Sequence, residues 1–208
     1  MADLAVSPDH ILEIGFAFRK SKALLSAVEL GLFAVLAEGP QGVEALTCRL
    51  GLQGRGARDF FDALVALELL DRDDNGRYAN TSAGSAYLDP HQPTYLGDLL
   101  EYLNVRMYRS WDLLTPALRQ GRPQCGPAAA GGFMDFYTDT AAFEIFLKGM
   151  TGGSRMAARA LAEKFPWEAH KTFVDIGTAQ GCMPVEIARA HAHLTGGGFD
   201  LPQLLCCR

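Results

Sequence analysis

The sequence predicts a mainly helical N-terminal domain followed by the beginning of an α/β domain with a parallel sheet. Apolar residues recur at helical spacing through most of residues 11–165. A hairpin signal interrupts them at Asn75-Gly76, between two short extended runs. From Thr172 onward, a strand pattern, a glycine-bearing turn, a helix and a possible second strand follow in that order, which is typical of an α/β unit.

Composition and charge restrict the class of protein. With 49% hydrophobic and 21% charged residues, the chain is typical of a folded globular protein, which argues against disorder. A net charge of −5 gives no electrostatic reason to expect a nucleic-acid partner. We expect no membrane contact, because no apolar run reaches the roughly 18–20 residues that span a bilayer. The five cysteines are odd in number and lack the spacing of disulfides or a metal site, so we expect a cytoplasmic protein without a metal.

The first 90 residues contain four expected helices and a hairpin. Two consecutive helices fit residues 11–36, with a joint near Leu30-Gly31. A short helix over 43–50 ends at Gly51, and another covers 58–70. The hairpin pairs 69–72 with 77–81. The order helix, turn, helix, hairpin is that of a winged helix.

The middle of the chain reads as a linker followed by helices. Two prolines within 89–93 break regular structure, and helical patterns follow over 96–108, 110–119 and 136–165. Residues 121–132 are rich in Gly, Pro and Ala, and predict a surface loop. The last helix carries an apolar stripe that core packing explains better than a ligand pocket: Phe143, Phe146, Leu147 and Met150. Tyr108 and Trp111 fit either core or pocket.

The segment 172–181 contains the residues that indicate a ligand-binding site. Gly177 lets a ligand approach the backbone without a Cβ in the way, and Asp175 lies at the carboxyl end of the strand, where open α/β sheets bind ligands. Asp200 ends the possible second strand, where a carboxylate can accept hydrogen bonds from both hydroxyls of a ribose. Ala179 replaces the middle glycine of a pyrophosphate-binding turn, which favours a cofactor without phosphate, such as S-adenosylmethionine (SAM). A plain strand-to-helix turn is the alternative.

Four segments together resemble the SAM-dependent small-molecule O-methyltransferases of the plant and acetylserotonin type and their bacterial relatives. They are residues 27–33, 78–81, 175–181 and 199–202. The resemblance implies a winged-helix dimerisation domain over 1–90, a helical linker and substrate-pocket segment over 91–168, and an incomplete Rossmann-like SAM-binding segment over 169–208. It also implies a homodimer and a small, hydroxylated, aromatic methyl acceptor.

The resemblance further assigns residues to the cofactor. Asp200 is expected to hold the ribose, Gly177 and Asp175 to lie beside the cofactor, and Tyr137 and Ser154 to face its pocket. In this family the general base is a histidine that follows the region matched here, so no residue of this chain is expected to be catalytic. His191 and His193 are expected to be surface or helix-dipole residues. We therefore expect the chain, C-terminally truncated relative to the family, to lack methyl-transfer activity by itself.

Two functions from other classes remain open. The chain could be a non-catalytic dimerisation module that pairs with a full-length methyltransferase. It could also be a winged-helix regulator that binds DNA, since Arg55 and Arg58 open the would-be recognition helix. Against this, Asp59, Asp62 and Glu68 on the same helix would face the phosphate backbone.

Overall fold

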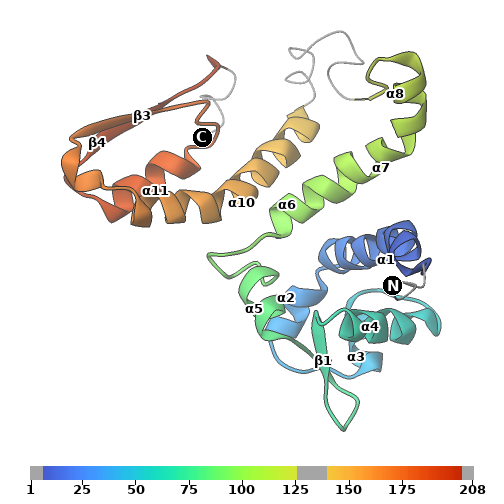
Figure 1. Cartoon of the computed structure of the whole chain (residues 1–208). Helices are drawn as coiled ribbons and strands as arrows, with labels where there is room; N and C mark the ends of the chain where they lie inside the picture. The colour runs from blue at the N-terminus through green and yellow to red at the C-terminus, as the bar shows by residue number, and fades with distance from the viewer. Residues whose placement is uncertain (1–6, 126–139, 203–208) are drawn as a thin grey trace, which may run out of the picture. The chain divides into compact units, whose positions relative to one another are not determined.

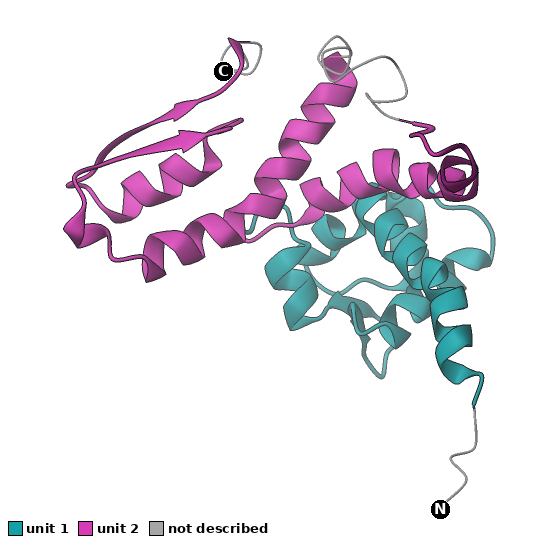
Figure 2. Ribbon diagram, turned by 45° about the horizontal axis from the view of Figure 1, so that its top comes forward, with its two compact units in different colours: residues 1–92 teal, residues 93–208 magenta. Residues whose placement is uncertain are grey.

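The computed structural model describes residues 7–125 and 140–202, and the chain divides into two compact units, residues 1–92 and 93–208 (Figure 2). Figure 1 labels most of the helices and strands of both units. Within the described ranges, none of the helices combines the length and the apolarity that crossing a bilayer requires.

From residue 7 onward, the first unit consists of five helices and a two-stranded hairpin. The helices are α1 (Asp9–Glu29), α2 (Leu32–Ala37), α3 (Val43–Arg49), α4 (Gly56–Ala66) and α5 (Ser82–Tyr87). The predicted joint between the first two helices is confirmed, because Gly31 adopts a left-handed φ of 69° there. Gly51 ends α3 in the same way, with φ 64°.

The hairpin follows α4 directly. Strands β1 (Leu70–Arg72) and β2 (Tyr78–Asn80) pair antiparallel, with Leu70 opposite Asn80. The helix predicted over 58–70 is too long, because Glu68 takes a left-handed φ of 59° that ends helical geometry before the strand begins. Helix and hairpin thus occur in the predicted order, and their identification as a winged helix stays a prediction.

Two aromatic side chains lie at the centre of the core of the first unit. Tyr78 and Phe61 are almost fully buried, with ring centroids 5.4 Å apart. The Tyr78 hydroxyl donates a hydrogen bond of 2.7 Å to Asp62 Oδ1. Burial, followed by this hydrogen bond, raises the pKa of the Tyr78 phenol. The hairpin is therefore fixed to α4 by one side chain that combines apolar and polar contacts.

The second unit contains a helical segment, a long helix and a strand–helix–strand unit. In chain order the elements are α6 (Gly97–Tyr102), a π-helical turn η1 (Leu103–Met107), α7 (Tyr108–Ser110), a 3-10 turn η2 (Trp111–Leu113), α8 (Leu114–Gln120), α10 (Thr140–Lys164), a 3-10 turn η4 (Trp167–Ala169), β3 (Thr172–Ile176), α11 (Cys182–Ala190) and β4 (Thr195–Phe199).

Glycines allow α6 and α10 to lie close together. A Cβ added at Gly149 would lie 2.6 Å from the Tyr102 Cβ, and one at Gly152 would lie 3.3 Å from the Asp98 Cβ. Of the predicted apolar stripe on α10, Phe143 and Leu147 are buried, which confirms the core interpretation for those two residues. Helix α10 is thereby held by α6 at the level of its middle turns.

The strands β3 and β4 pair in parallel, with Thr172 opposite Thr195 and Ile176 opposite Phe199. One face packs on a small apolar core that lies beneath α11 and the end of α10: Ala162, Trp167, Ile187 and Leu194, with Phe173 and Met183 against it. On the other face Val174 and Ile176 are 64% and 70% exposed. Strand β4 ends at Phe199, so Asp200 directly follows the strand rather than forming its last residue.

Candidate functional site

The turn that leaves β3 has an unusual backbone. Gly177, Ala179 and Gly181 adopt φ angles of 82°, 46° and 78°, so three alternate residues lie in the left-handed region. This conformation suits glycine but costs an L-residue about 1–2 kcal/mol, so Ala179 is strained. A Cβ built at Gly177 would meet no other atom within 4 Å. The space in front of this glycine is therefore open to a ligand.

Asp200 lies beside the turn, as the sequence predicts for the ends of neighbouring parallel strands. Its Oδ2 accepts a hydrogen bond of 2.7 Å from the backbone N–H of Ala179, and its Oδ1 accepts one of 2.8 Å from Leu201. A carboxylate has about four acceptor sites, so each oxygen keeps one for a ligand. Asp175 contributes a second negative charge at the same sheet edge and lies opposite Gly198 in the strand pair.

Thr178 and Gly198 form a close contact that sequence reasoning missed. Thr178 is buried, and its hydroxyl has no hydrogen-bond partner among the described residues. A Cβ at Gly198 would overlap the Thr178 side chain, so glycine is required there for the turn to lie against β4. The signal available in the sequence is the glycine run 196–198 inside a strand, which indicates a close approach by another part of the protein.

Helix α10 is attached to the turn by side chains. The Thr151 hydroxyl donates a hydrogen bond of 2.7 Å to Gln180 Oε1. The Cys182 thiol at the start of α11 points to the Thr151 carbonyl oxygen at 3.9 Å. Burial raises the pKa of that thiol, against a smaller opposing effect of Arg155, so the thiolate form is disfavoured. Ser154 follows Thr151 by one turn and is half-buried on α10.

The remaining predicted residues have other locations. Tyr137 lies outside the described residues. His191 Nε2 lies 2.7 Å from the Ala162 carbonyl oxygen and His193 Nε2 lies 3.2 Å from that of Trp167, so both contact the backbone at the end of α10 and beyond it. Within residues 7–125 and 140–202, no three His, Cys, Asp or Glu side chains gather to hold a metal ion.

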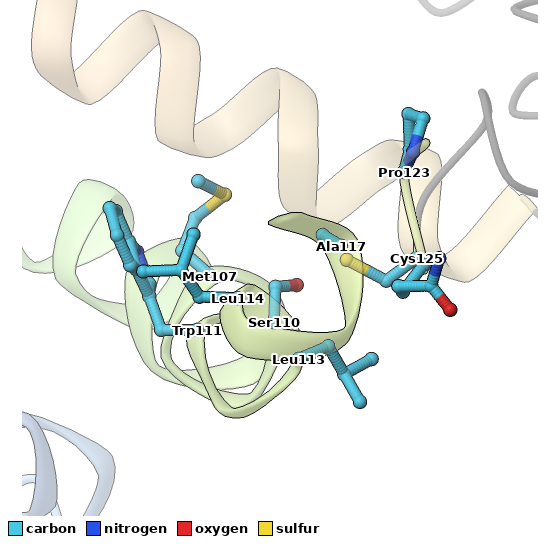
Figure 3. A pocket seen from close by; sticks show the side chains of 9 residues that line it. Met107, Ser110, Trp111, Leu113, Leu114, Ala117, Pro123 and Cys125 are labelled. Atoms are coloured by element: carbon cyan, nitrogen blue, oxygen red, sulfur yellow. The ribbon is translucent and has the colours of Figure 1, made fainter. Parts of the chain in front are cut away.

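A second feature of this unit is an apolar pocket of about 220 Å³ (Figure 3). It is lined by η1, α7, η2, α8 and the following turn: Met107, Ser110, Trp111, Leu113, Leu114, Ala117, Pro123, Gln124 and Cys125. The Trp111 side chain is 65% exposed, although it is large and apolar. Trp111, whose role the sequence left open, is thus a wall of the pocket, whereas Tyr108 is not among the lining residues.

Comparisons with known proteins match both units. Residues 12–90 match the family model described as the O-methyltransferase dimerisation domain, and residues 111–206 match that described as the O-methyltransferase domain. The chain is 40% identical over 197 residues to the tetracenomycin polyketide synthesis 8-O-methyl transferase TcmO of Streptomyces glaucescens, covering 95% of this chain and 58% of that protein. It is 38% identical to the N,N-dimethyltransferase OxyT of Streptomyces rimosus, covering 93% of this chain and 57% of that protein.

The chain is also similar to a solved structure. The crystal structure of human N-acetylserotonin methyltransferase in complex with SAM superposes with a TM-score of 0.86 at 26% identity, over 98% of this chain and 62% of that chain. The chain thus spans less than two thirds of the length of these relatives.

Proposed function

The chain belongs to the O-methyltransferase family, and on that premise we propose that it supplies the dimerisation and SAM-binding parts of an enzyme that methylates a small aromatic hydroxyl compound. The observation that carries the proposal is the contact between Asp200 and the turn. It brings a carboxylate with spare acceptor sites next to the open space at Gly177. These residues fit a ribose bound against a glycine backbone.

Each residue near the turn has a part in this proposal. Asp200 would accept hydrogen bonds from the ribose hydroxyls, and Gly177 would allow the cofactor to lie against the backbone. Asp175 and Ser154 are proposed to border the same pocket, together with Tyr137. SAM, when bound, supplies a methyl group on a positively charged sulfur. The protein then contributes mainly by holding acceptor and cofactor in line.

The apolar pocket is the proposed site for the ring of the acceptor. A flat aromatic ring suits apolar walls such as Trp111, Met107 and Leu114. The name of the Streptomyces glaucescens relative specifies an oxygen, and that of the Streptomyces rimosus relative a nitrogen. Family membership favours a hydroxyl oxygen as the methylated atom of this protein.

Calorimetry tests the proposed binding of the cofactor. Isothermal titration calorimetry with S-adenosylhomocysteine should show one site per chain, and Asp200→Asn should weaken it by about tenfold or more, because hydrogen bonds to a charged group contribute about 1.5–3 kcal/mol. Asp74→Asn, the same change at an exposed residue of the hairpin turn, is the control. Absence of binding to the unmodified chain would refute the proposal.

A second part of the proposal concerns methyl transfer by the 208-residue chain itself. The described residues include Asp200 and the glycine turn, which are proposed to hold the cofactor, whereas the family resemblance puts the general base beyond the matched region. We therefore propose that the 208-residue chain binds the cofactor without transferring its methyl group. Incubation with radiolabelled SAM and a panel of small aromatic hydroxyl compounds tests this, and labelled product from the pure chain would contradict it.

The first helix supports a homodimer. Ile11, Ile14 and Phe18 share one side of α1 and are 74%, 64% and 55% exposed. Exposed apolar stripes of this kind mark protein–protein contacts. Light scattering should give a dimer mass for the unmodified chain and a monomer mass for Ile14→Glu/Phe18→Glu, while Lys20→Glu on the same helix should stay dimeric. A dimer in the double variant would exclude α1 from the interface.

A further inference from the structure

The fourth residue of the turn has a side chain whose orientation is fixed from outside the turn. Gln180 lies between Ala179 and Gly181, both left-handed, so its backbone direction is determined by its neighbours. Its Oε1 accepts the hydrogen bond of 2.7 Å from the Thr151 hydroxyl of α10. Helices α10 and α11 pack against each other, and Gln180 lies just before α11 begins.

The direction of this hydrogen bond determines which group of the Gln180 amide can bind a ligand. Since Oε1 is the atom that faces Thr151, the Nε2 group is directed away from α10 and carries two N–H donors. The side chain is exposed, and no described residue accepts a hydrogen bond from Nε2. The turn therefore presents a fixed amide donor at its surface.

A positive charge lies at the same junction. Arg155 is one turn beyond Thr151 on α10 and is half-buried. Its charge acts on the Cys182 thiol, which contacts the Thr151 carbonyl oxygen. Arg155 forms no ion pair with any described residue, whereas the nearby Arg159 is paired with Glu186 at 3.4 Å. A neutral donor and an uncommitted cation together suit a carboxylate.

We propose that Gln180 recognises the carboxylate at the amino-acid end of the cofactor, and that Thr151 is the positioning residue that holds the Gln180 amide in the donating orientation. The inference rests on the proposed SAM site. It assigns the two ends of the cofactor to different parts of the turn: Asp200 to the ribose and Gln180 to the amino-acid tail.

The test compares two ligands that differ in that tail. S-adenosylhomocysteine carries the amino acid, and 5′-methylthioadenosine lacks it. Gln180→Glu keeps an acceptor oxygen for Thr151 and replaces the donating Nε2 by a second, negatively charged oxygen. We expect calorimetry to show at least about tenfold weaker S-adenosylhomocysteine binding, the size of one charge-assisted hydrogen bond. Binding of 5′-methylthioadenosine should stay within about twofold. Gln53→Glu, the same change at an exposed residue of the first unit, should alter neither affinity.

Thr151 is tested by two substitutions of similar size. Thr151→Val removes the hydroxyl and should weaken S-adenosylhomocysteine alone by about threefold to tenfold, the effect of one neutral hydrogen bond. Thr151→Ser keeps the hydroxyl and should restore the unmodified affinity. Far-UV circular dichroism and thermal unfolding of each variant report whether it is folded.

The possible outcomes are distinguishable. Equal weakening of both ligands by Gln180→Glu, or no weakening of either, would overturn the assignment of Gln180 while leaving the SAM site intact. Failure of Thr151→Ser to restore affinity would overturn the positioning role of Thr151. If the unmodified chain binds neither ligand, the proposed function fails and this inference fails with it.

Discussion

Gly198→Ala is expected to destabilise the second unit for a purely steric reason. The new Cβ would overlap the Cγ2, Oγ1 and Cβ atoms of the buried Thr178, and the overlap with the Cβ atom cannot be relieved by rotating that side chain. Gly198 does not adopt a left-handed φ, so backbone strain contributes nothing. Overpacking of this kind costs about 1–3 kcal/mol.

The neighbouring glycine provides a matched control. A Cβ at Gly197 would meet no atom within 4 Å, and its φ is also ordinary. Gly197→Ala should therefore be neutral or stabilising by up to about 1 kcal/mol, because alanine restricts the unfolded chain more than glycine does. The two variants should differ in free energy of unfolding by about 2–3 kcal/mol, or on the order of 10 °C in Tm.

Urea denaturation followed by tryptophan fluorescence measures this difference. The chain has two tryptophans, and a Trp111→Phe background leaves only Trp167, which is buried in the core beneath the sheet. Adding Thr178→Ala to Gly198→Ala removes two of the three overlapping atoms and should restore part of the stability. If the Gly197 and Gly198 variants unfold within about 0.5 kcal/mol of each other, the steric argument is wrong.

Three further predictions concern single residues. Ala179→Gly should leave the free energy of unfolding unchanged or raise it by up to about 1 kcal/mol, because it relieves a left-handed alanine, whereas Ala188→Gly in α11 should lower it by about 1 kcal/mol in the same urea titration. Thr178→Val should stabilise by about 1 kcal/mol, because it removes a buried hydroxyl without a described partner, and calorimetric unfolding that shows a loss would contradict this. Hydrogen bonds, first that from the His91 backbone N–H, hold the pKa of Asp89 below its ordinary value, so its stabilising contribution is present above that ordinary value and is lost as the pH falls through the lowered pKa. The stability advantage of the unmodified chain over Asp89→Asn should therefore shrink in acid, as urea midpoints at neutral pH and near pH 3 will show.

Much of the local structure follows from periodicity and turn chemistry. The joint at Gly31, the hairpin around Asn75-Gly76 and the strand before Gly177 all occur where the pattern indicates. The end of α4 does not, because Glu68 adopts a left-handed conformation that nothing in its side chain specifies. Boundaries of this kind depend on where the following strand must begin.

Some contacts of the candidate site could likewise be predicted from the sequence, and others could not. The meeting of Asp200 with the turn could be predicted, since parallel neighbours bring their carboxyl ends to one edge. The hydrogen bond between Thr151 and Gln180 could not, because it depends on how α10 packs on α11 across a long stretch of sequence. The contact of Thr178 with Gly198 depends likewise on strand register.

The hydrogen bond between Ala179 and Asp200 also has a consequence for the lifetime of the chain. It joins the end of β4 to the turn after β3, so a ligand seated on the turn would also oppose separation of the strands. By mass action, ligand at 100 times its Kd adds about 2.7 kcal/mol to the stability of the state that binds it. A chain deprived of ligand would open there more often, and the glycine run 196–198, which is solvent-exposed but held in the strand pair, would then be free to enter a protease. Bound ligand would thereby slow proteolysis at this glycine run.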